Sequence, residues 1–403
     1  MIEIEAFLDL HTHTRYPDNN NFPSEDIEFA AKNGGFSEIL AMPNSEMVID
    51  SIENLNKARE IDKNLKITIH RAGALTKDLE GKELVNYKEF VENGVFIFSD
   101  DGKSLIDNNL ADEAFKSVAS LNSAIFQHCE SNCHIKPGDI APPNDNDSLI
   151  PIDEKEESEI LLRDIELVAK YGTRYHAQHI SSKKCVELIK EAKENNLPIT
   201  SEATPHHILE NNENLDLSNG LYKMYPPIRT EEDRIALIDG LLNNTIDVIA
   251  TDHAPHPEST KIVDFKNAAR GVVGLESAFP MIYSSEIFSI EEIKKFMVEN
   301  PRKILSEIGY EVKIPETNIW QACNKEFKTK SQFNNSIFEI KSKNEDVLNI
   351  TFENKFRKCN YKLKLLDINS GIPNSPAIII IIGTPSCKSV SYTHLTLPTI
   401  LLV

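Results

Sequence analysis

The sequence lacks the features that mark proteins of membranes, of oxidising compartments and of nucleic-acid complexes. No apolar run reaches the roughly 20 residues of a membrane-spanning helix. No basic segment followed by an apolar one stands at the N-terminus. The six cysteines have no zinc-finger spacing and suggest a reducing compartment. The formal charge of −20 argues against nucleic acid or an anionic membrane as the main partner, so we expect a soluble cytoplasmic protein.

Two further absences narrow the fold and the chemistry. No Gly-rich phosphate loop follows the first apolar run, which disfavours an open doubly wound sheet, the alternative fold. No Ser or Cys nucleophile motif is present. The chain offers instead eight apolar, β-branched runs, each followed by a stretch with helical spacing, and this alternation predicts a (β/α)8 TIM-like barrel. The predicted strands are Ala6–His11, Glu38–Met42, Lys66–Gly73, Gly94–Ser99, Ser123–His128, Arg174–Ile180, Pro198–Ala203 and Asp247–Thr251. The predicted helices are Ser24–Asn33, Ser51–Lys63, Tyr87–Asn93, Ala111–Leu121, Glu156–Tyr171, Ser182–Asn195, Glu231–Leu242 and Ile290–Glu299.

Histidines gather where the predicted strands end. Nine of the twelve histidines lie at such ends, and the first strand ends in His11 and His13. Alternate side chains of a strand share a face, so these two imidazoles point the same way, about 6–7 Å apart. A surface His-x-His pair is the simpler interpretation of these two alone. In a (β/α)8 barrel, however, all strands end at the face that carries the chemistry, so the clustering favours a metal site.

Imidazole and carboxylate groups at these ends suit zinc. Four histidines and two aspartates exceed what one tetrahedral ion needs, and they suit two ions about 3.5–4 Å apart. A bound water whose pKa falls to about 7 is a nucleophile at neutral pH, and a nearby carboxylate can pass its proton to a leaving nitrogen. The residues therefore predict metal-assisted hydrolysis, or the reverse condensation, at a carbonyl.

Nine short motifs together resemble the dihydroorotase family of the amidohydrolase superfamily, in the right order and from about residue 6 to about residue 340. The sequence is similar to the bacterial type, in which an aspartate replaces the carbamylated lysine. The motifs are Asp9-Leu-His-Thr-His-Thr-Arg15, Ala41-Met-Pro-Asn44, Phe98-Ser-Asp-Asp-Gly102, His128-Cys-Glu130, His179-Ile-Ser181, Ala203-Thr-Pro-His-His207, Pro226-Pro-Ile-Arg229, Ala250-Thr-Asp-His-Ala-Pro-His256 and Gly274-Leu-Glu276.

The resemblance implies a centre for one or two zinc ions, two being favoured. Asp252 would also be the general base and acid. Asp100 is the alternative to Asp101 as the ligand that bridges or flanks the two ions, because adjacent strand residues face opposite ways and only one of the two can face the site. The implied ligands are His11, His13 and Asp252 for one ion, His128 and His179 for the second, and Asp101 bridging or flanking the pair.

The same resemblance implies a substrate side. Arg15 and Asn44 would clamp a substrate carboxylate, which a guanidinium fork suits, and His256 would contact the same substrate. Two implied positions depart from the family pattern: Tyr225 stands where the family usually has asparagine, and Arg270-Gly271 stands where it usually has Phe-Gly.

Other polar residues at the strand ends have structural interpretations. Asp9 lies deeper on the face of His11, and we expect it to support the ligands. We expect His206, His207 and His253 to pack or to hydrogen-bond beside the site. His176 stands an odd number of residues from His179, so we expect it to point away from the metals.

The activity implied by the resemblance is the reversible cyclisation of N-carbamoyl-L-aspartate to dihydroorotate and water, in pyrimidine biosynthesis. Because Tyr225 departs from the pattern, a hydantoinase-like or allantoinase-like cyclic amidohydrolase is an alternative. An inactive homologue that scaffolds aspartate transcarbamoylase is another, although every ligand position is filled. A homodimer and an aspartate transcarbamoylase partner are further expectations.

The resemblance also divides the chain. We expect the barrel over residues 1–312 and a C-terminal β segment of a small partial sandwich over 313–360, because Phe327–Phe338 resembles the family's C-terminal segment. Family members usually have sandwich strands before the barrel, and their absence here suggests a short subfamily or a truncated gene model. The assignment of 361–403 is open, and 387–403 resembles a translated sequencing adapter rather than a native tail.

Overall fold

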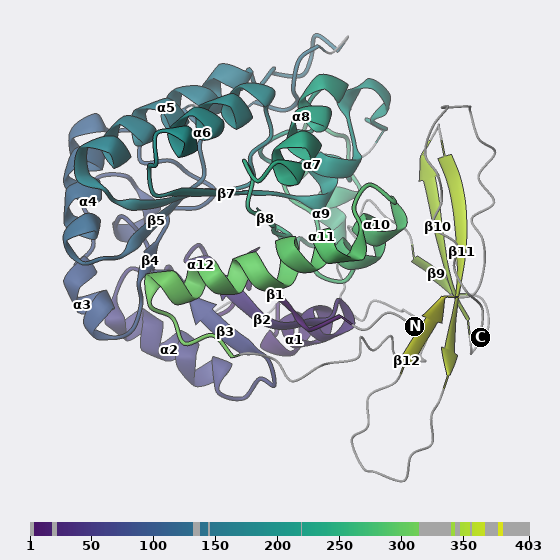
Figure 1. Cartoon of the computed structure of the whole chain (residues 1–403), viewed down its shortest axis with the longest axis horizontal. Helices are drawn as coiled ribbons and strands as arrows, with labels where there is room; N and C mark the ends of the chain where they lie inside the picture. Colours follow the sequence, from purple (N-terminus) through teal and green to yellow (C-terminus); the bar gives the residue numbers. More distant parts are fainter. Residues whose placement is uncertain are drawn as a thin grey trace.

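The computed structural model describes residues 4–17, 22–131, 138–143, 146–218 and 220–313, and the backbone of four strands between residues 340 and 381. Eight parallel strands alternate with helices that pack around them (Figure 1). Each predicted strand has an observed counterpart within a few residues. The strands are β1 (Phe7–Thr12), β2 (Phe36–Ala41), β3 (Thr68–Arg71), β4 (Ile97–Phe98), β5 (Ala124–Gln127), β6 (Arg174–Ala177), β7 (Ile199–Ala203) and β8 (Val248–Ile249).

The helices begin at the caps that the sequence provides. Ser51 accepts a hydrogen bond from the backbone of Asn54, and Thr230 and Asp233 form a reciprocal capping box. The long helices after β1 to β7 are α1 (Ser24–Asn33), α2 (Ile52–Asp62), α3 (Tyr87–Glu92), α4 (Asn108–Ser120), α5 (Glu154–Tyr171), α6 (Lys183–Glu194) and α8 (Glu231–Leu242). Short α7 (Pro205–Leu209) follows β7, and β8 is followed by α9 (Glu258–Lys261), α10 (Ala278–Ser284), α11 (Ile290–Lys294), a π-helical turn (Lys295–Glu299) and α12 (Asn300–Ile308).

The strands close into a barrel. They pair in parallel in chain order as β1-β2-β3 and β4-β5-β6-β7-β8. Gly73 joins the two sets, because its backbone nitrogen donates to Ile97 at 2.9 Å and its carbonyl accepts from Ser99. The ring is completed where the backbone nitrogen of His13 donates to the carbonyl of His253 at 2.9 Å. The predicted (β/α)8 barrel is confirmed, and an open doubly wound sheet is excluded.

Two apolar layers hold the barrel together. The outer layer packs strand residues such as Ile39 and Ile125 against the surrounding helices. The inner layer contains Leu8 and Phe126, and Leu305 of α12, which crosses the barrel in Figure 1, packs against it. Because α12 closes the N-terminal end of the barrel, the end available to a substrate is the opposite one, where the strands terminate.

The four C-terminal strands form one antiparallel sheet in the order β12-β11-β10-β9. Strand β11 runs across residue 360, so the predicted segments 313–360 and 361–403 both contribute strands to this sheet. The domain boundaries given above stay predictions. The sandwich itself stays a prediction, and the segment 387–403 lies outside the described residues. Among the described helices, none is long and apolar enough to cross a membrane. The strands are β9 (Ile340–Ser342), β10 (Val347–Asn354), β11 (Arg357–Leu366) and β12 (Ile378–Ile381).

Candidate metal centre

The ends of β1 and β8 bring three of the predicted ligands together. His13 Nε2 lies 3.0 Å from Asp252 Oδ1, and His11 Nε2 lies 3.5 Å from the same oxygen. All three side chains are buried. One ligand atom from each residue lies within 4.8 Å of the other two, which is close enough for one ion to bind all three.

Asp101 links this group to the histidines of β5 and β6. Its Oδ1 lies 3.2 Å from His11 Nε2 and 3.6 Å from His179 Nε2, and its Oδ2 lies 3.3 Å from His13 Nε2. His128 Nδ1 lies 2.8 Å from His179 Nε2 and 4.0 Å from Asp101 Oδ1. Asp101 therefore stands between the two groups of imidazoles, where a bridging ligand would stand.

Asp100 and Asp101, the two candidates for one ligand position, point to different partners. Asp100 accepts hydrogen bonds from the backbone nitrogens of Leu75 and Thr76, at 2.8 and 2.9 Å, and from the Thr76 hydroxyl. Its side chain therefore fastens the end of β4 to the segment after β3. Only Asp101 faces the imidazoles.

The donor set fits a divalent cation on structural grounds. Within the described part of the chain, His11 Nε2 and Asp101 Oδ1 are buried and have no hydrogen-bond partner, although they face each other. Such atoms are costly to bury unless something satisfies them. A metal ion between them would do so, and the mixture of imidazole and carboxylate is the one zinc prefers.

The electrostatics of the centre couple its carboxyl groups to its imidazoles. Burial would lower the pKa of His11, but nearby carboxylates such as Asp101 outweigh it and hold the value well above its usual range, so a metal ion at this imidazole would displace a proton. Burial alone would raise the pKa of Asp101 and Asp252, but the imidazoles of His11 and His13 outweigh it and hold both values below their usual range. Burial, followed by the neighbouring His179, lowers the pKa of His128 to about 3. The carboxyl groups are therefore anionic and His128 is neutral.

Two side chains from other strands hold the imidazoles of β1. Asn44 Oδ1 lies 2.8 Å from His13 Nδ1, and its amide nitrogen donates to the Asp101 carbonyl at 3.0 Å. In this structure, Asn44 contacts two candidate ligands rather than standing free for substrate. Glu202, which sequence reasoning missed, lies 2.5 Å from His11 Nδ1 through Oε1. The sequence does contain a signal for Glu202: it is an acidic residue inside a predicted strand, and a buried carboxylate needs a hydrogen-bond partner.

The backbone around the centre is also fixed. Asp9 accepts from the backbone nitrogen and the hydroxyl of Thr251, both at 2.7 Å, so it joins β1 to β8 and does not reach the ligand atoms. Three residues adopt left-handed backbone conformations: Arg15 (φ 63°), His179 (φ 32°) and Asp252 (φ 48°). Such conformations are strained in residues other than glycine and are found preferentially at functional sites.

The predicted substrate residues form a second cluster beside the ligands. Arg15 Nε donates to the Pro255 carbonyl at 3.2 Å, and its Nη2 lies 3.5 Å from His256 Nε2. His256 Nε2 donates to the Arg270 carbonyl at 2.5 Å. Burial, with Arg15 adding to it, lowers the pKa of His256 to about 3, so this imidazole is neutral. A positive guanidinium and a neutral donor thus stand near the metal ligands.

Tyr225 lies at the border of the centre. The centroid of the Tyr225 ring is 5.2 Å from that of His128. The guanidinium carbon of Arg270 lies 5.4 Å from the same Tyr225 centroid. At Gly271 φ is 114°, and an added Cβ would come within 2.7 Å of the Ala254 Cβ. Glycine is therefore required there for the chain to pass this closely.

Three further histidines at the strand ends make structural contacts. His253 Nδ1 accepts from the backbone nitrogen of Gly274 at 3.1 Å. His207 bonds Thr204 and the carbonyl of Pro226, and His176 contacts Glu202 at 3.1 Å on the side away from the metal ligands. These contacts agree with the structural interpretation of the three residues.

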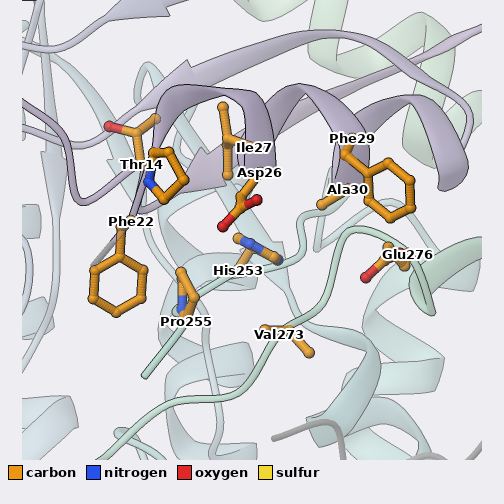
Figure 2. Close-up of a pocket in the computed structure, with 11 residues that line it drawn as sticks. Thr14, Phe22, Asp26, Ile27, Phe29, Ala30, His253, Pro255, Val273 and Glu276 are labelled. Atoms are coloured by element: carbon orange, nitrogen blue, oxygen red, sulfur yellow. The ribbon is translucent and has the colours of Figure 1, made fainter. Parts of the chain in front are cut away.

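A separate pocket lies between α1 and the segments that follow β8. Figure 2 shows Asp26, His253 and Glu276 among the residues that line it. No predicted ligand or substrate residue is among its described lining residues. The pocket therefore adjoins the back of the centre and is not the predicted substrate cavity.

The fold and the site together define a metal-dependent amidohydrolase of the TIM-barrel type. The structure is similar to L-hydantoinase (dihydropyrimidinase) from Arthrobacter aurescens, with a TM-score of 0.64 and 22% identity over 75% of this chain and 71% of that one. It is also similar to dihydroorotase from Saccharomyces cerevisiae in complex with 5-fluoroorotic acid, with a TM-score of 0.62 and 19% identity over 77% and 85%. At these identities the likeness shows the fold.

The sequence comparisons identify the family. Residues 2–185 match the model for dihydro-orotase-like proteins. The chain is 38% identical to dihydroorotase of Fusobacterium nucleatum over 357 residues, which are 85% of this chain and 82% of the relative. It is 39% identical to dihydroorotase of Staphylococcus aureus over 285 residues, 69% and 67% of the two chains. The chain belongs to the dihydroorotase family, and the predicted resemblance is confirmed.

Proposed function

We propose that this protein is a zinc-dependent dihydroorotase, which interconverts N-carbamoyl-L-aspartate and dihydroorotate with loss or gain of water in pyrimidine biosynthesis. The observation that supports this most strongly is the convergence of six side chains from five strand ends. These ligands are His11, His13, Asp101, His128, His179 and Asp252. We favour two zinc ions, because two groups of candidate ligands are each close enough to hold an ion: His11, His13 and Asp252 in one, and His11, Asp101 and His179 in the other.

In the ring-opening direction, water adds to the amide carbonyl carbon and the ring carbon–nitrogen bond breaks. Zinc, when bound, polarises that carbonyl and lowers the pKa of the water. The anionic carboxylate of Asp252 takes the proton that the water loses and delivers it to the leaving ring nitrogen. Ring closure runs the same transfers in reverse, so one carboxylate acts as base and then as acid.

The substrate carboxylate is assigned to the cluster around Arg15. Its guanidinium lies two residues beyond His13 on the same chain segment and can bind a carboxylate with two hydrogen bonds. His256 is neutral and lies beside Arg15, so it can contact the same substrate without adding charge. This arrangement suits a cyclic amide that carries a carboxylate on its ring.

Tyr225 supports a second candidate. A phenol cannot reproduce both hydrogen bonds of the asparagine that the family usually has, and its ring packs against His128. A cyclic amide without the acidic group, such as hydantoin or allantoin, is therefore the alternative substrate. The presence of all six ligands argues against an inactive scaffold. A homodimer and an aspartate transcarbamoylase partner stay predictions.

The test is turnover by purified, zinc-loaded protein. We expect dihydroorotate to be consumed at alkaline pH, where ring opening is favoured, and N-carbamoyl-L-aspartate to be cyclised at lower pH, both followed by ultraviolet absorbance. The variant Asp252→Asn in the same zinc-loaded form is the control for contaminating activity. Turnover of hydantoin or allantoin with none of dihydroorotate would contradict the proposal.

A further inference from the structure

Glu202 occupies an unusual position for a carboxylate. It lies in β7 and is fully buried, and it stands an odd number of residues from Ile199 and Ala203, which belong to the outer apolar layer. Because side chains of a strand alternate, Glu202 points into the barrel. A carboxylate buried in this way is costly unless its oxygens are hydrogen-bonded, so its partners reveal what holds it there.

Each oxygen of Glu202 has a defined partner. Oε1 lies 2.5 Å from His11 Nδ1 and accepts from the backbone nitrogen of His179 at 3.1 Å. Oε2 lies 3.1 Å from His176 Nε2, whose other ring nitrogen meets the Thr200 hydroxyl at 2.8 Å. One carboxylate thus contacts a candidate ligand on β1 and another that follows β6.

These contacts determine which nitrogen of His11 can bind a metal. An ionised carboxylate only accepts hydrogen bonds, so Nδ1 of His11 must carry the proton. When the ring is neutral, Nε2 then has the lone pair, and this is the atom that faces Asp101 and Asp252. The other tautomer would place a proton where the ligand lone pair is needed.

The contact with His179 acts on the backbone. His179 has a positive φ of 32°, which is unfavourable for a residue with a side chain. The hydrogen bond from its backbone nitrogen to Glu202 Oε1 stabilises that conformation. His179 Nε2 is thereby kept 3.6 Å from Asp101 Oδ1 and 2.8 Å from His128 Nδ1.

We infer that Glu202 is a positioning residue that sets both groups of metal ligands at once, through the ring tautomer of His11 and the backbone of His179. This inference rests on the proposed function, because it assumes that the two histidines bind metal. It goes beyond that function by assigning a role to a residue that does not reach substrate or metal.

The variants Glu202→Met and Glu202→Gln separate this role from mere packing. Methionine keeps the length of the side chain but accepts no strong hydrogen bond, and we expect the zinc affinity to fall about 10–100-fold, the usual effect of removing such a support. Glutamine should cost less, because its carbonyl can replace Oε1 while His176 changes tautomer to accept from the amide. We therefore predict that zinc affinity is lowest in Glu202→Met, higher in Glu202→Gln and highest in the wild type.

Glu38→Met is the matched control. Glu38 is also a buried glutamate of a barrel strand that pairs with an imidazole, His70 Nε2 at 3.0 Å, but it lies at the end that α12 closes. We expect this variant to lose stability and to keep the zinc affinity of the wild type. Affinity would be measured on the full-length chain by competition with a chromophoric zinc chelator, together with thermal unfolding.

The outcomes are distinguishable. Equal zinc affinity in the wild type and Glu202→Met would overturn the inference and leave the proposed function standing, whereas a wild type that binds no zinc would overturn both. If Glu202→Met fails to fold, the inference can still be tested on the wild type, through the protonation of His11. Long-range ¹H–¹⁵N spectra of the zinc-loaded protein labelled at histidine should show His11 protonated at Nδ1, and protonation at Nε2 would contradict the inference.

Discussion

The two ends of the barrel interior use the same pair of residue types differently. At the end closed by α12, Glu38 meets the imidazole of His70 and the guanidinium of Arg302, which lies 3.3 Å away. At the open end, Glu202 meets His11, whose far nitrogen has no hydrogen-bond partner in the described chain. A buried glutamate–histidine pair is structural when cations and apolar groups complete it. The same pair can support a metal site when the second ring nitrogen of the imidazole faces further candidate ligands.

The largest effect should come from Asp252→Asn at the open end. The amide cannot take a proton and is a poor zinc ligand, so we expect kcat/KM to fall at least about 10³-fold. The free energy of unfolding of the metal-free protein should also fall, because the variant loses a carboxylate that the imidazoles of His11 and His13 stabilise. Steady-state kinetics and urea unfolding check this, and a variant within about tenfold of wild-type activity would contradict it.

The closed end should respond in the opposite way. Leu305 of α12 is fully buried in the inner apolar layer. Leu305→Ala should lower the free energy of unfolding by about 2–5 kcal/mol, the usual cost of such a cavity, with turnover per folded molecule unchanged. Loss of turnover without loss of stability would show that the two ends are not separate in function.

Removing the guanidinium tests the substrate side of the open end. Arg15→Met should raise KM about 10–100-fold, since a hydrogen bond to a charged group contributes about 1.5–3 kcal/mol. Zinc content should be unchanged, because Arg15 does not lie among the ligands. Arg15→Lys is the matched control, and it should recover part of the loss. Unchanged KM in Arg15→Met would remove Arg15 from the substrate site.

The smallest effect concerns a buried carboxyl group outside both ends. Burial raises the pKa of Glu276 from 4.5 to about 7, only partly offset by the amide of Asn33. A raised pKa means that the folded state binds this proton more tightly, so the wild type loses stability as pH rises from about 4.5 to about 7. Glu276→Gln should match the wild type near pH 4 and exceed its free energy of unfolding by about 2 kcal/mol at pH 8. Equal pH profiles from urea unfolding would contradict this.

The sequence predicted what depends on local pattern. Strand alternation and turn residues located all eight strands, and the ends of those strands contained every candidate ligand. The sequence could not choose between Asp100 and Asp101, because that depends on which side of a two-residue strand faces inward. It missed Glu202 and assigned Asn44 to substrate alone, because contacts such as Glu202 with His11 join residues 191 positions apart.

The most direct test of the central claim is a zinc titration of metal-free protein, with dihydroorotate turnover followed at each step. We predict that activity is absent without metal and rises to a plateau at about two equivalents of zinc, since the strand ends provide two groups of ligands. Full turnover in metal-free protein, or no turnover of dihydroorotate at any zinc loading, would contradict the account.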